Sequence, residues 1–196
     1  KAEGKDVLNF SLGEPDFNSP PEVIEEAKKA LDAGKTKYTN VDGTPALKKA
    51  IVEKLKRENN LSYEPEEVFA SAGAKQAIFN AFAASLNKGD EVIIPAPFWV
   101  SYADIVEIFE GKPIIHKTRL ENKFKITGKE LATLITPKTK WLILNSPSNP
   151  TGEVYTKEEL SSLAKVLLKN PQVMVLSDDI YEHLIFEGKQ FYNILN

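Results

Sequence analysis

Three apolar runs in this sequence each end in residues whose types could do chemistry. A carboxylate at Asp178, an amide at Asn149 and a glycine turn at Gly73 all come within a few residues of such an end. The runs are EVFAS (67–71), WLILN (141–145) and VMVLS (173–177). In an open parallel sheet, ligands collect beyond the carboxyl ends of the strands. These positions are therefore the first candidates for a binding site.

Small residues follow the first run, in the order Ala72, Gly73, Ala74 and Lys75. They allow a close backbone approach at the start of a helix, where unpaired N–H groups and the helix dipole favour an anion. This stretch suits a phosphate group. It is neither a Walker loop nor GxGxxG, which disfavours a nucleotide. Tight packing between strand and helix is the alternative interpretation.

The second run gives way to Ser-Pro-Ser-Asn-Pro-Thr-Gly (146–152). Two X-Pro bonds stiffen this loop, and Asn149 before Pro150 is driven toward an extended or turn conformation, with a cis bond as one option. A rigid loop could aim the Asn149 amide at a ligand. A proline-stiffened turn that only reverses the chain is the alternative.

The third run leads into Asp178, Asp179 and, two residues later, Tyr181. Neighbouring side chains on an extended segment point to opposite sides, so we expect only one of the two carboxylates to face a pocket. A metal site would need converging ligands, and the sequence shows none: His116 and His183 stand far apart, without ligand spacing. Both histidines are assigned to packing or surface positions. A solvated strand end is the alternative for the Asp pair.

The elements that would position these residues alternate between strands and helices. Short apolar strands without polar alternation are typical of parallel strands covered by helices, so the pattern predicts an α/β fold with a mostly parallel sheet between helical layers. Ser19 and Thr44 before prolines, and the pair Thr156/Glu159, predict helix starts. The expected strands cover 67–71, 91–95, 112–116, 141–145 and 173–177, and the expected helices 19–34, 44–59, 74–86, 99–109, 128–135 and one from 156.

Composition excludes several classes of protein. The chain has 196 residues, 42% of them apolar, which is enough for a sizeable core. A net charge of −3, with 25 basic and 28 acidic residues mixed along the chain, leaves no basic stripe for nucleic acid. The absence of cysteine argues against disulfide-stapled secretion and structural zinc. No apolar stretch predicts a membrane span or a signal peptide, so a cytoplasmic protein is expected.

The order of these motifs resembles the class I aminotransferases, the aspartate aminotransferase-like enzymes of fold type I that use pyridoxal phosphate. The similarity covers nearly the whole chain and is strongest to the bacterial branch that transaminates aspartate and, in some members, prephenate. The motifs that carry it are LGEPDF (12–17), KYTNVDG (37–43), PAPFWVSY (95–102), NSPSNPTG (145–152) and SDDIYEH (177–183).

The resemblance implies a role for each matching residue. Gly73, Ala74 and Lys75 would hold the cofactor phosphate. Trp99 would stack on the pyridine ring and contact substrate. Asn149 and Tyr181 would donate hydrogen bonds to the phenolic oxygen, and Asn149 would also lie near the substrate. Asp178 would lie beneath the pyridine nitrogen. An anion there keeps the nitrogen protonated, which lets the ring accept electrons. Relatives usually carry Asp-Glu where this chain has Asp178-Asp179.

Two further matches concern substrate and assembly. Gly13 resembles a glycine whose backbone lies against the substrate. Tyr38 resembles a tyrosine that reaches the cofactor phosphate of the neighbouring subunit, which implies a homodimer with shared active sites. By the same resemblance, residues 1–20 would be an N-terminal segment associated with a small domain, and residues 21–196 would begin the large cofactor domain.

The largest departure from the family is an absence. The family binds its cofactor as a Schiff base to a lysine well downstream of SDDIYEH, and the sequence ends at Asn196 before any such motif. No residue of this chain is therefore assigned as catalytic. We expect the chain to be the amino-terminal part of an aminotransferase, inactive by itself. The full-length enzyme would transfer an amino group between aspartate or glutamate and a 2-oxo acid.

Two alternatives stay open at this stage. Fold type I also includes C–S lyases and related eliminating enzymes, which would release pyruvate and ammonia from a cysteine conjugate. The other alternative is a non-catalytic protein of this fold, such as a regulator that binds pyridoxal phosphate, or a stable remnant. Such regulators carry a DNA-binding helix-turn-helix before this domain, and the start of this sequence shows neither that motif nor a basic face.

Overall fold

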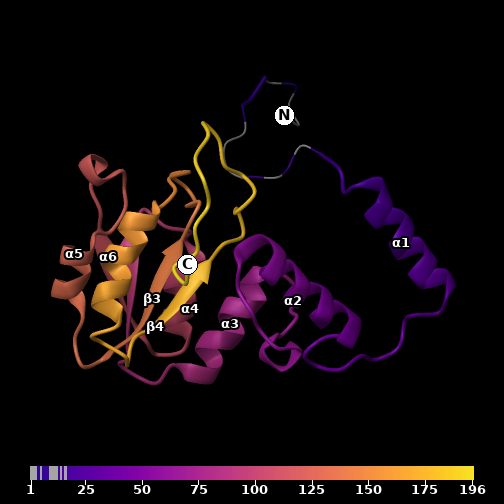
Figure 1. Ribbon diagram of the computed structural model, residues 1–196, viewed down its shortest axis with the longest axis horizontal. Helices are drawn as coiled ribbons and strands as arrows, with labels where there is room; N and C mark the ends of the chain where they lie inside the picture. Colours follow the sequence, from indigo (N-terminus) through magenta and orange to yellow (C-terminus); the bar gives the residue numbers. More distant parts are fainter. Residues whose placement is uncertain (1–3, 5, 9–12, 14, 16) are drawn as a thin grey trace. The chain divides into compact units, whose positions relative to one another are not determined.

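The structure is a computed structural model that describes residues 4, 6–8, 13, 15 and 17–196 (Figure 1). The chain divides into two compact units, Lys1–Asn40 and Val41–Asn196. In the part of the chain that is described, no helix has both the length and the apolar character needed to cross a membrane.

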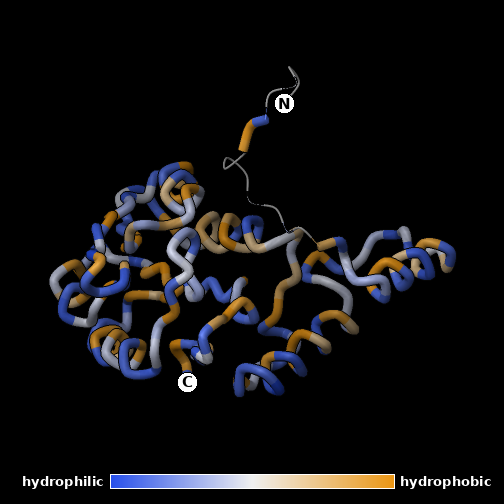
Figure 2. The backbone as a smooth tube through the Cα atoms, turned by 90° about the horizontal axis from the view of Figure 1, so that it is seen from above, coloured by the Kyte–Doolittle hydropathy of each residue, from blue (hydrophilic) through white to orange (hydrophobic). Residues whose placement is uncertain are grey.

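The first unit contains helix α1 (Pro21–Asp32), which alternates hydrophobic and hydrophilic residues around its turns (Figure 2). None of its residues is buried. The prediction that Ser19 caps this helix was wrong. Pro20 occupies the N-cap position without a side-chain hydrogen bond, so Ser19 lies one residue too early to reach the first turn.

The second unit is built on a sheet of four parallel strands in the order β2-β1-β3-β4. The strands are β1 (Glu91–Ala96), β2 (Lys112–Lys117), β3 (Thr139–Asn145) and β4 (Met174–Asp178). Their positions agree with the predicted strands within one or two residues, and the parallel sheet is confirmed. The register pairs Asn145 at the end of β3 with Asp178 at the end of β4. Two of the predicted polar strand ends are thereby neighbours.

The predicted strand at 67–71 was wrong. The structure has a short 3₁₀ helix, η1 (Pro65–Glu67), followed by irregular backbone. A strand requires a ladder of hydrogen bonds to a neighbour. Among the described residues, the one backbone hydrogen bond from this segment to a distant part of the chain runs from the Ala70 N–H to the Asp42 carbonyl, at 2.9 Å. β-branched and aromatic residues alone do not create a strand without a partner.

Helices cover both faces of the sheet (Figure 1). The inward side chains alternate along the strands, as a strand period of two requires: Val92, Ile94 and Ile143 pack on one face, and Ile93, Leu142 and Leu144 on the other. The first face carries α3 (Ala74–Ser85) and α4 (Ser101–Ile108), and the second carries α5 (Gly128–Leu134) and α6 (Lys157–Leu167). The three-layer α/β fold is confirmed. Helix α2 (Pro45–Asn59) and the 3₁₀ helix η2 (Leu120–Asn122) complete the unit.

Two predicted helix starts are confirmed in atomic detail. The Thr44 hydroxyl accepts a hydrogen bond from the Leu47 N–H at 3.3 Å, with Pro45 at the first helical position of α2. At the start of α6, Thr156 and Glu159 form a reciprocal capping box. Such caps satisfy N–H groups that have no partner inside the helix.

Gly128 at the start of α5 lies so close to α6 that any side chain would collide. A Cβ there would stand 2.4 Å from the Ser162 hydroxyl and 2.7 Å from its carbonyl oxygen. We expect Gly128→Ala to lower the free energy of unfolding by about 1–3 kcal/mol, the usual result of overpacking. Urea denaturation measures this, and exposed Lys129→Ala on the same helix is the control, with an expected change within about 0.5 kcal/mol. Equal stability of the two variants would contradict close α5–α6 packing.

Candidate functional site

A cavity of about 290 Å³ lies where the carboxyl ends of β3 and β4 meet the start of α3. This is the sheet edge at which the sequence predicted a ligand site. Seven of the predicted residues line this one cavity: Gly73, Ala74, Lys75, Trp99, Asn149, Asp178 and Tyr181. They come from separate parts of the chain, so the fold brings them together.

The small-residue turn forms the amino end of α3. Gly73 is the N-cap residue, with φ of 85°, a left-handed conformation that glycine adopts without steric penalty. The N–H groups of the first helical turn have no acceptor within the helix. Because Gly73, Ala74 and Lys75 line the cavity, this turn is well placed to meet an anion there.

Trp99 lies just before α4 and makes contacts on two sides. Its ring meets that of Tyr102 edge to face, with centroids 5.3 Å apart and an interplanar angle of 84°. The Lys75 ammonium lies 4.9 Å from the Trp99 ring centroid, a cation–π distance. These contacts restrain an aromatic surface at the wall of the cavity. The predicted helix at 99–109 begins only at Ser101, which leaves Trp99 outside it.

Tyr102 is a site residue that the sequence analysis missed. Its hydroxyl donates a hydrogen bond of 2.6 Å to Oδ2 of Asp178, and its side chain is buried. Burial first, and then the bond to Asp178, raise the pKa of Tyr102 well above its usual range. The phenol therefore stays protonated and can act as a donor to Asp178 at all physiological pH values. Its place three residues after Trp99, within the helix predicted at 99–109, was the signal available in the sequence.

We expect Tyr102→Phe to lower the free energy of unfolding by about 1.5–3 kcal/mol, the usual worth of a hydrogen bond to a charged group. The change preserves the ring and removes only the donor to Asp178. Tyr192→Phe is the control, because the one hydrogen bond of that hydroxyl among the described residues is an exposed contact with Gln190. Chemical denaturation of both variants measures the difference. A Tyr102→Phe protein as stable as the control would contradict a tight bond to Asp178.

Asn145 is the second residue that the sequence analysis missed. Its amide donates to the Asp178 carbonyl at 2.8 Å, and its side-chain oxygen accepts from the Asn149 N–H at 2.7 Å. Asn145 therefore links the end of β4 to the proline-stiffened loop. The Asn149–Pro150 bond is cis, as are Ser146–Pro147 and Ala96–Pro97.

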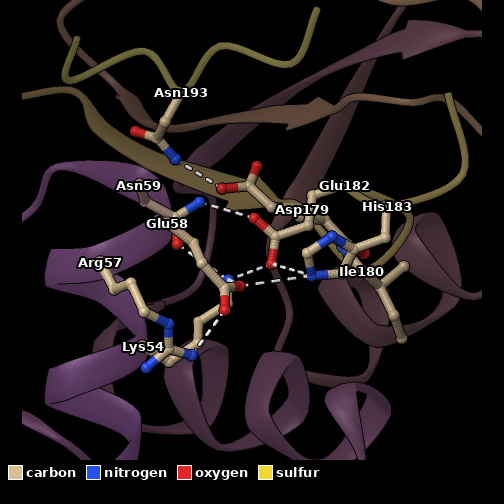
Figure 3. Close-up of polar contacts among 10 residues, drawn as sticks. Lys54, Arg57, Glu58, Asn59, Asp179, Ile180, Glu182, His183 and Asn193 are labelled. Carbon is tan, nitrogen blue, oxygen red and sulfur yellow. Dashed lines mark hydrogen bonds and ion pairs between the residues drawn. The ribbon is translucent and has the colours of Figure 1, made fainter.

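Asp179 faces away from the cavity, as the alternation along an extended segment predicts. It accepts hydrogen bonds from the Ser177 hydroxyl at 2.7 Å and from the Asn193 amide (Figure 3). Burial raises the pKa of Asp179 despite these bonds. The two adjacent carboxylates thus have different surroundings, and only Asp178 lines the cavity described above.

The remaining predicted residues, Gly13 and Tyr38, belong to the first unit. Both are exposed there, and their roles stay predictions. Within the LGEPDF motif, residues 12, 14 and 16 lie outside the described residues. Of the two histidines, His183 is exposed, whereas His116 lies with Nε2 3.6 Å from Glu130.

Comparison with known proteins identifies the family. Residues 5–196 match the family described as aminotransferase class I and II. The probable aspartate/prephenate aminotransferase of Rickettsia bellii is 57% identical over 99% of this chain and 49% of its own length. The aspartate/prephenate aminotransferase of Cereibacter sphaeroides is 53% identical over 97% of this chain and 48% of its own.

A solved structure shows the same fold. The crystal structure of the aspartate aminotransferase from Rhizobium meliloti superimposes with a TM-score of 0.96 at 50% identity, over 98% of this chain and 48% of that one. The chain thus spans about half the length of the curated relatives it matches. With the family matched over nearly all of its residues, the chain belongs to the class I and II aminotransferases.

Proposed function

We propose that this chain supplies the cofactor-binding floor of a pyridoxal-phosphate-dependent aminotransferase. The observation that carries the proposal is the convergence of a helix start, an aromatic ring, an amide, a phenol and a carboxylate on one cavity. Names of relatives such as aspartate/prephenate aminotransferase support the same activity.

The residues present fit the chemistry of the cofactor. Pyridoxal phosphate has an anionic phosphate, a flat ring, a phenolic oxygen and a ring nitrogen that must be protonated. The first turn of α3 offers N–H groups and a nearby Lys75 for the phosphate. Trp99 offers a flat surface, and Asp178 offers a carboxylate for the nitrogen. Asn149 and Tyr181 supply hydrogen-bond donors for the phenolic oxygen.

The bound cofactor would supply the electron sink that stabilises charge when the substrate loses its α-proton. The residues of this chain would hold the cofactor in place and polarise its ring. Asp178 would keep a proton on the ring nitrogen because an anion beside that nitrogen favours the charged form. Tyr102 and Asn145 hold Asp178 in place, through its Oδ2 and its carbonyl oxygen. Trp99 would fix the ring plane and exclude water from one face.

The substrates and the assembly belong to the same proposal. An amino acid, either aspartate or glutamate, would donate its amino group, and a 2-oxo acid would accept it. Gly13 would lie against the substrate, and Tyr38 would reach the cofactor phosphate of a second subunit in a homodimer. Residues 1–20 would be an N-terminal segment associated with a small domain, and residues 21–196 would form the N-terminal part of the large cofactor domain.

An assay of the full-length protein with pyridoxal phosphate, aspartate and 2-oxoglutarate tests the activity. Oxaloacetate and glutamate should appear in equal amounts. Formation of pyruvate and ammonia from a cysteine conjugate, without any 2-oxo acid acceptor, would instead favour a C–S lyase. If neither reaction occurs and the protein does not bind pyridoxal phosphate, the proposal is refuted.

Borohydride reduction tests the role of Lys75. Among the lysines that the structure describes, Lys75 alone lines the cavity, and its place in the first turn of α3 assigns it to the phosphate. We expect reduction of the full-length holoenzyme, followed by peptide mass mapping, to find a pyridoxyl group on a different lysine. Lys75→Met should retain that label. A pyridoxyl group on Lys75 itself would overturn its assignment to the phosphate.

A further inference from the structure

The turn after β4 sends its side chains to two opposite sides. Asp178 and Tyr181 line the cofactor cavity, whereas Asp179 and Glu182 line a separate groove of about 400 Å³. The turn is closed by the Glu182 N–H, which donates to the Asp179 carbonyl at 2.9 Å. Whatever holds Glu182 therefore also fixes the direction of its neighbour Tyr181.

Glu182 is held by helix α2. Its carboxylate accepts a hydrogen bond of 2.6 Å from the Asn59 amide and forms an ion pair with the Lys54 ammonium (Figure 3). Asn59 is buried, and only 14% of the Glu182 side chain is exposed. Lys54 also donates to Oδ1 of Asn59 at 2.8 Å, so the three side chains form a closed set.

The surrounding charges keep Glu182 ionised. Burial raises its pKa, but the bonds from Lys54 and Asn59 and the nearby positive charges outweigh burial, so the pKa of Glu182 lies below its ordinary value. Nε2 of His183 lies 3.6 Å from Glu182 and 3.5 Å from Glu58. Glu58, Glu182 and His183 could converge on a metal ion, but Lys54 already contacts both carboxylates and supplies the positive charge.

Asp178 and Tyr181 differ in how they are anchored. Asp178 is fixed by strand pairing, by Asn145 and by Tyr102. The Tyr181 hydroxyl, in contrast, makes no hydrogen bond with any residue that the structure describes, and Tyr181 follows the end of β4. Its direction therefore depends on the turn that carries it.

We propose that Glu182 is a positioning residue, whose bonds to Lys54 and Asn59 on α2 hold the turn so that Tyr181 faces the cofactor. This inference rests on the proposed function, because it assigns the Tyr181 hydroxyl to the cofactor's phenolic oxygen. Beyond the proposed function, a contact on the far side of the turn from the cavity supports the Tyr181 hydroxyl.

A double-mutant cycle in the full-length protein tests the inference. Glu182→Gln keeps the acceptor for Asn59 and removes the charge that binds Lys54. We expect it to weaken pyridoxal phosphate binding about tenfold when Tyr181 is present, and less than twofold in a Tyr181→Phe background, because coupled residues are not additive. Lys54→Met should reproduce the effect from the other side of the pair. Glu53→Gln is the matched control, since it removes an exposed carboxylate of the same helix that pairs with Lys49 at 3.9 Å, and it should change binding less than twofold.

Three results would overturn the inference. One is an equal loss of affinity for Glu182→Gln in both backgrounds, which would mean that it acts independently of Tyr181. Another is a lowered stability with unchanged affinity, which would show a structural role only. Absence of pyridoxal phosphate binding by the unmutated protein would refute the proposed function itself, and is recognised before any variant is made. Should Glu182→Gln not fold, the cycle is run with Lys54→Met and judged by the same results.

The pH dependence of stability gives an independent readout of the same ion pair. A carboxylate whose pKa is lower in the folded state than in the unfolded state stabilises the protein at pH values above its unfolded pKa, here 4.5. This stabilisation is lost as the pH falls through the folded pKa. The stability difference between the unmutated protein and Glu182→Gln should therefore be full at pH 7 and shrink as pH falls below 4.5. A difference that is constant across this range would argue against an ionised, paired Glu182.

Discussion

Replacing Asp178 by asparagine should lower the transamination rate of the full-length protein by roughly 10²–10⁴-fold, because losing one partner of a desolvated charge pair costs about 3–5 kcal/mol. Asparagine has nearly the same shape, so the cavity wall stays intact. What is lost is the negative charge that would keep a proton on the ring nitrogen. The same change also weakens the bond that Tyr102 donates to Oδ2.

The neighbouring carboxylate provides a matched control for this prediction. Asp179→Asn makes the same substitution one residue later, on the side of the turn that faces Ser177 and Asn193. We expect it to change the rate less than tenfold, since its carboxylate does not line the cavity. Steady-state kinetics with saturating pyridoxal phosphate separate the two variants. Similar losses from both, or an active Asp178→Asn enzyme, would contradict the role assigned to Asp178.

Replacing Phe82 by alanine should lower the free energy of unfolding by about 3–5 kcal/mol, the range for a large side chain removed from a packed core. Phe82 lies on α3 and is fully buried against the sheet. Its ring meets that of Trp141 edge to face, with centroids 5.7 Å apart. Because α3 also carries the turn at Gly73, the loss of this anchor should weaken ligand binding at that turn as well.

Phe79 on the same helix is the control for Phe82. It is 40% exposed and packs against Phe109 at a centroid distance of 4.8 Å. Phe79→Ala makes the same deletion at a position that water already reaches, so the expected loss is less than half of that for Phe82→Ala. Guanidinium denaturation at constant temperature compares the two. Equal losses would mean that the inner face of α3 does not anchor the helix.

Local chemistry made several features predictable from sequence. The strand ends at Asn145 and Asp178 were visible because apolar runs stop there, and parallel pairing places such ends side by side. Helix starts at Thr44 and Thr156 were predictable because a capping side chain acts within three residues. Asn149, Asp178 and Tyr181 were found because they lie within a few residues of these strand ends. Gly73, Ala74 and Lys75 were found from their small size at a helix start, and Trp99 only from the resemblance to the family.

The features that the sequence did not predict depend on long-range pairing. The segment 67–71 has the composition of a strand, but among the described residues it has only one backbone hydrogen bond to a part of the chain that is distant in sequence, at Ala70. The Tyr102–Asp178 bond and the set formed by Glu182, Lys54 and Asn59 each join residues far apart in sequence. The composition and spacing of a local segment do not predict which distant residues it will contact. The prediction that Ser19 caps α1 was wrong for a local reason, because Pro20 occupies the N-cap position.

A crystal structure of the full-length protein grown with pyridoxal phosphate would test the proposed cofactor site most directly. We expect density for the ring against Trp99, with its nitrogen at Asp178, its phenolic oxygen near Asn149 and Tyr181, and its phosphate at the first turn of α3. Density for the cofactor at another site, or in this cavity with the phosphate at Asp178, would contradict the assignment of these residues.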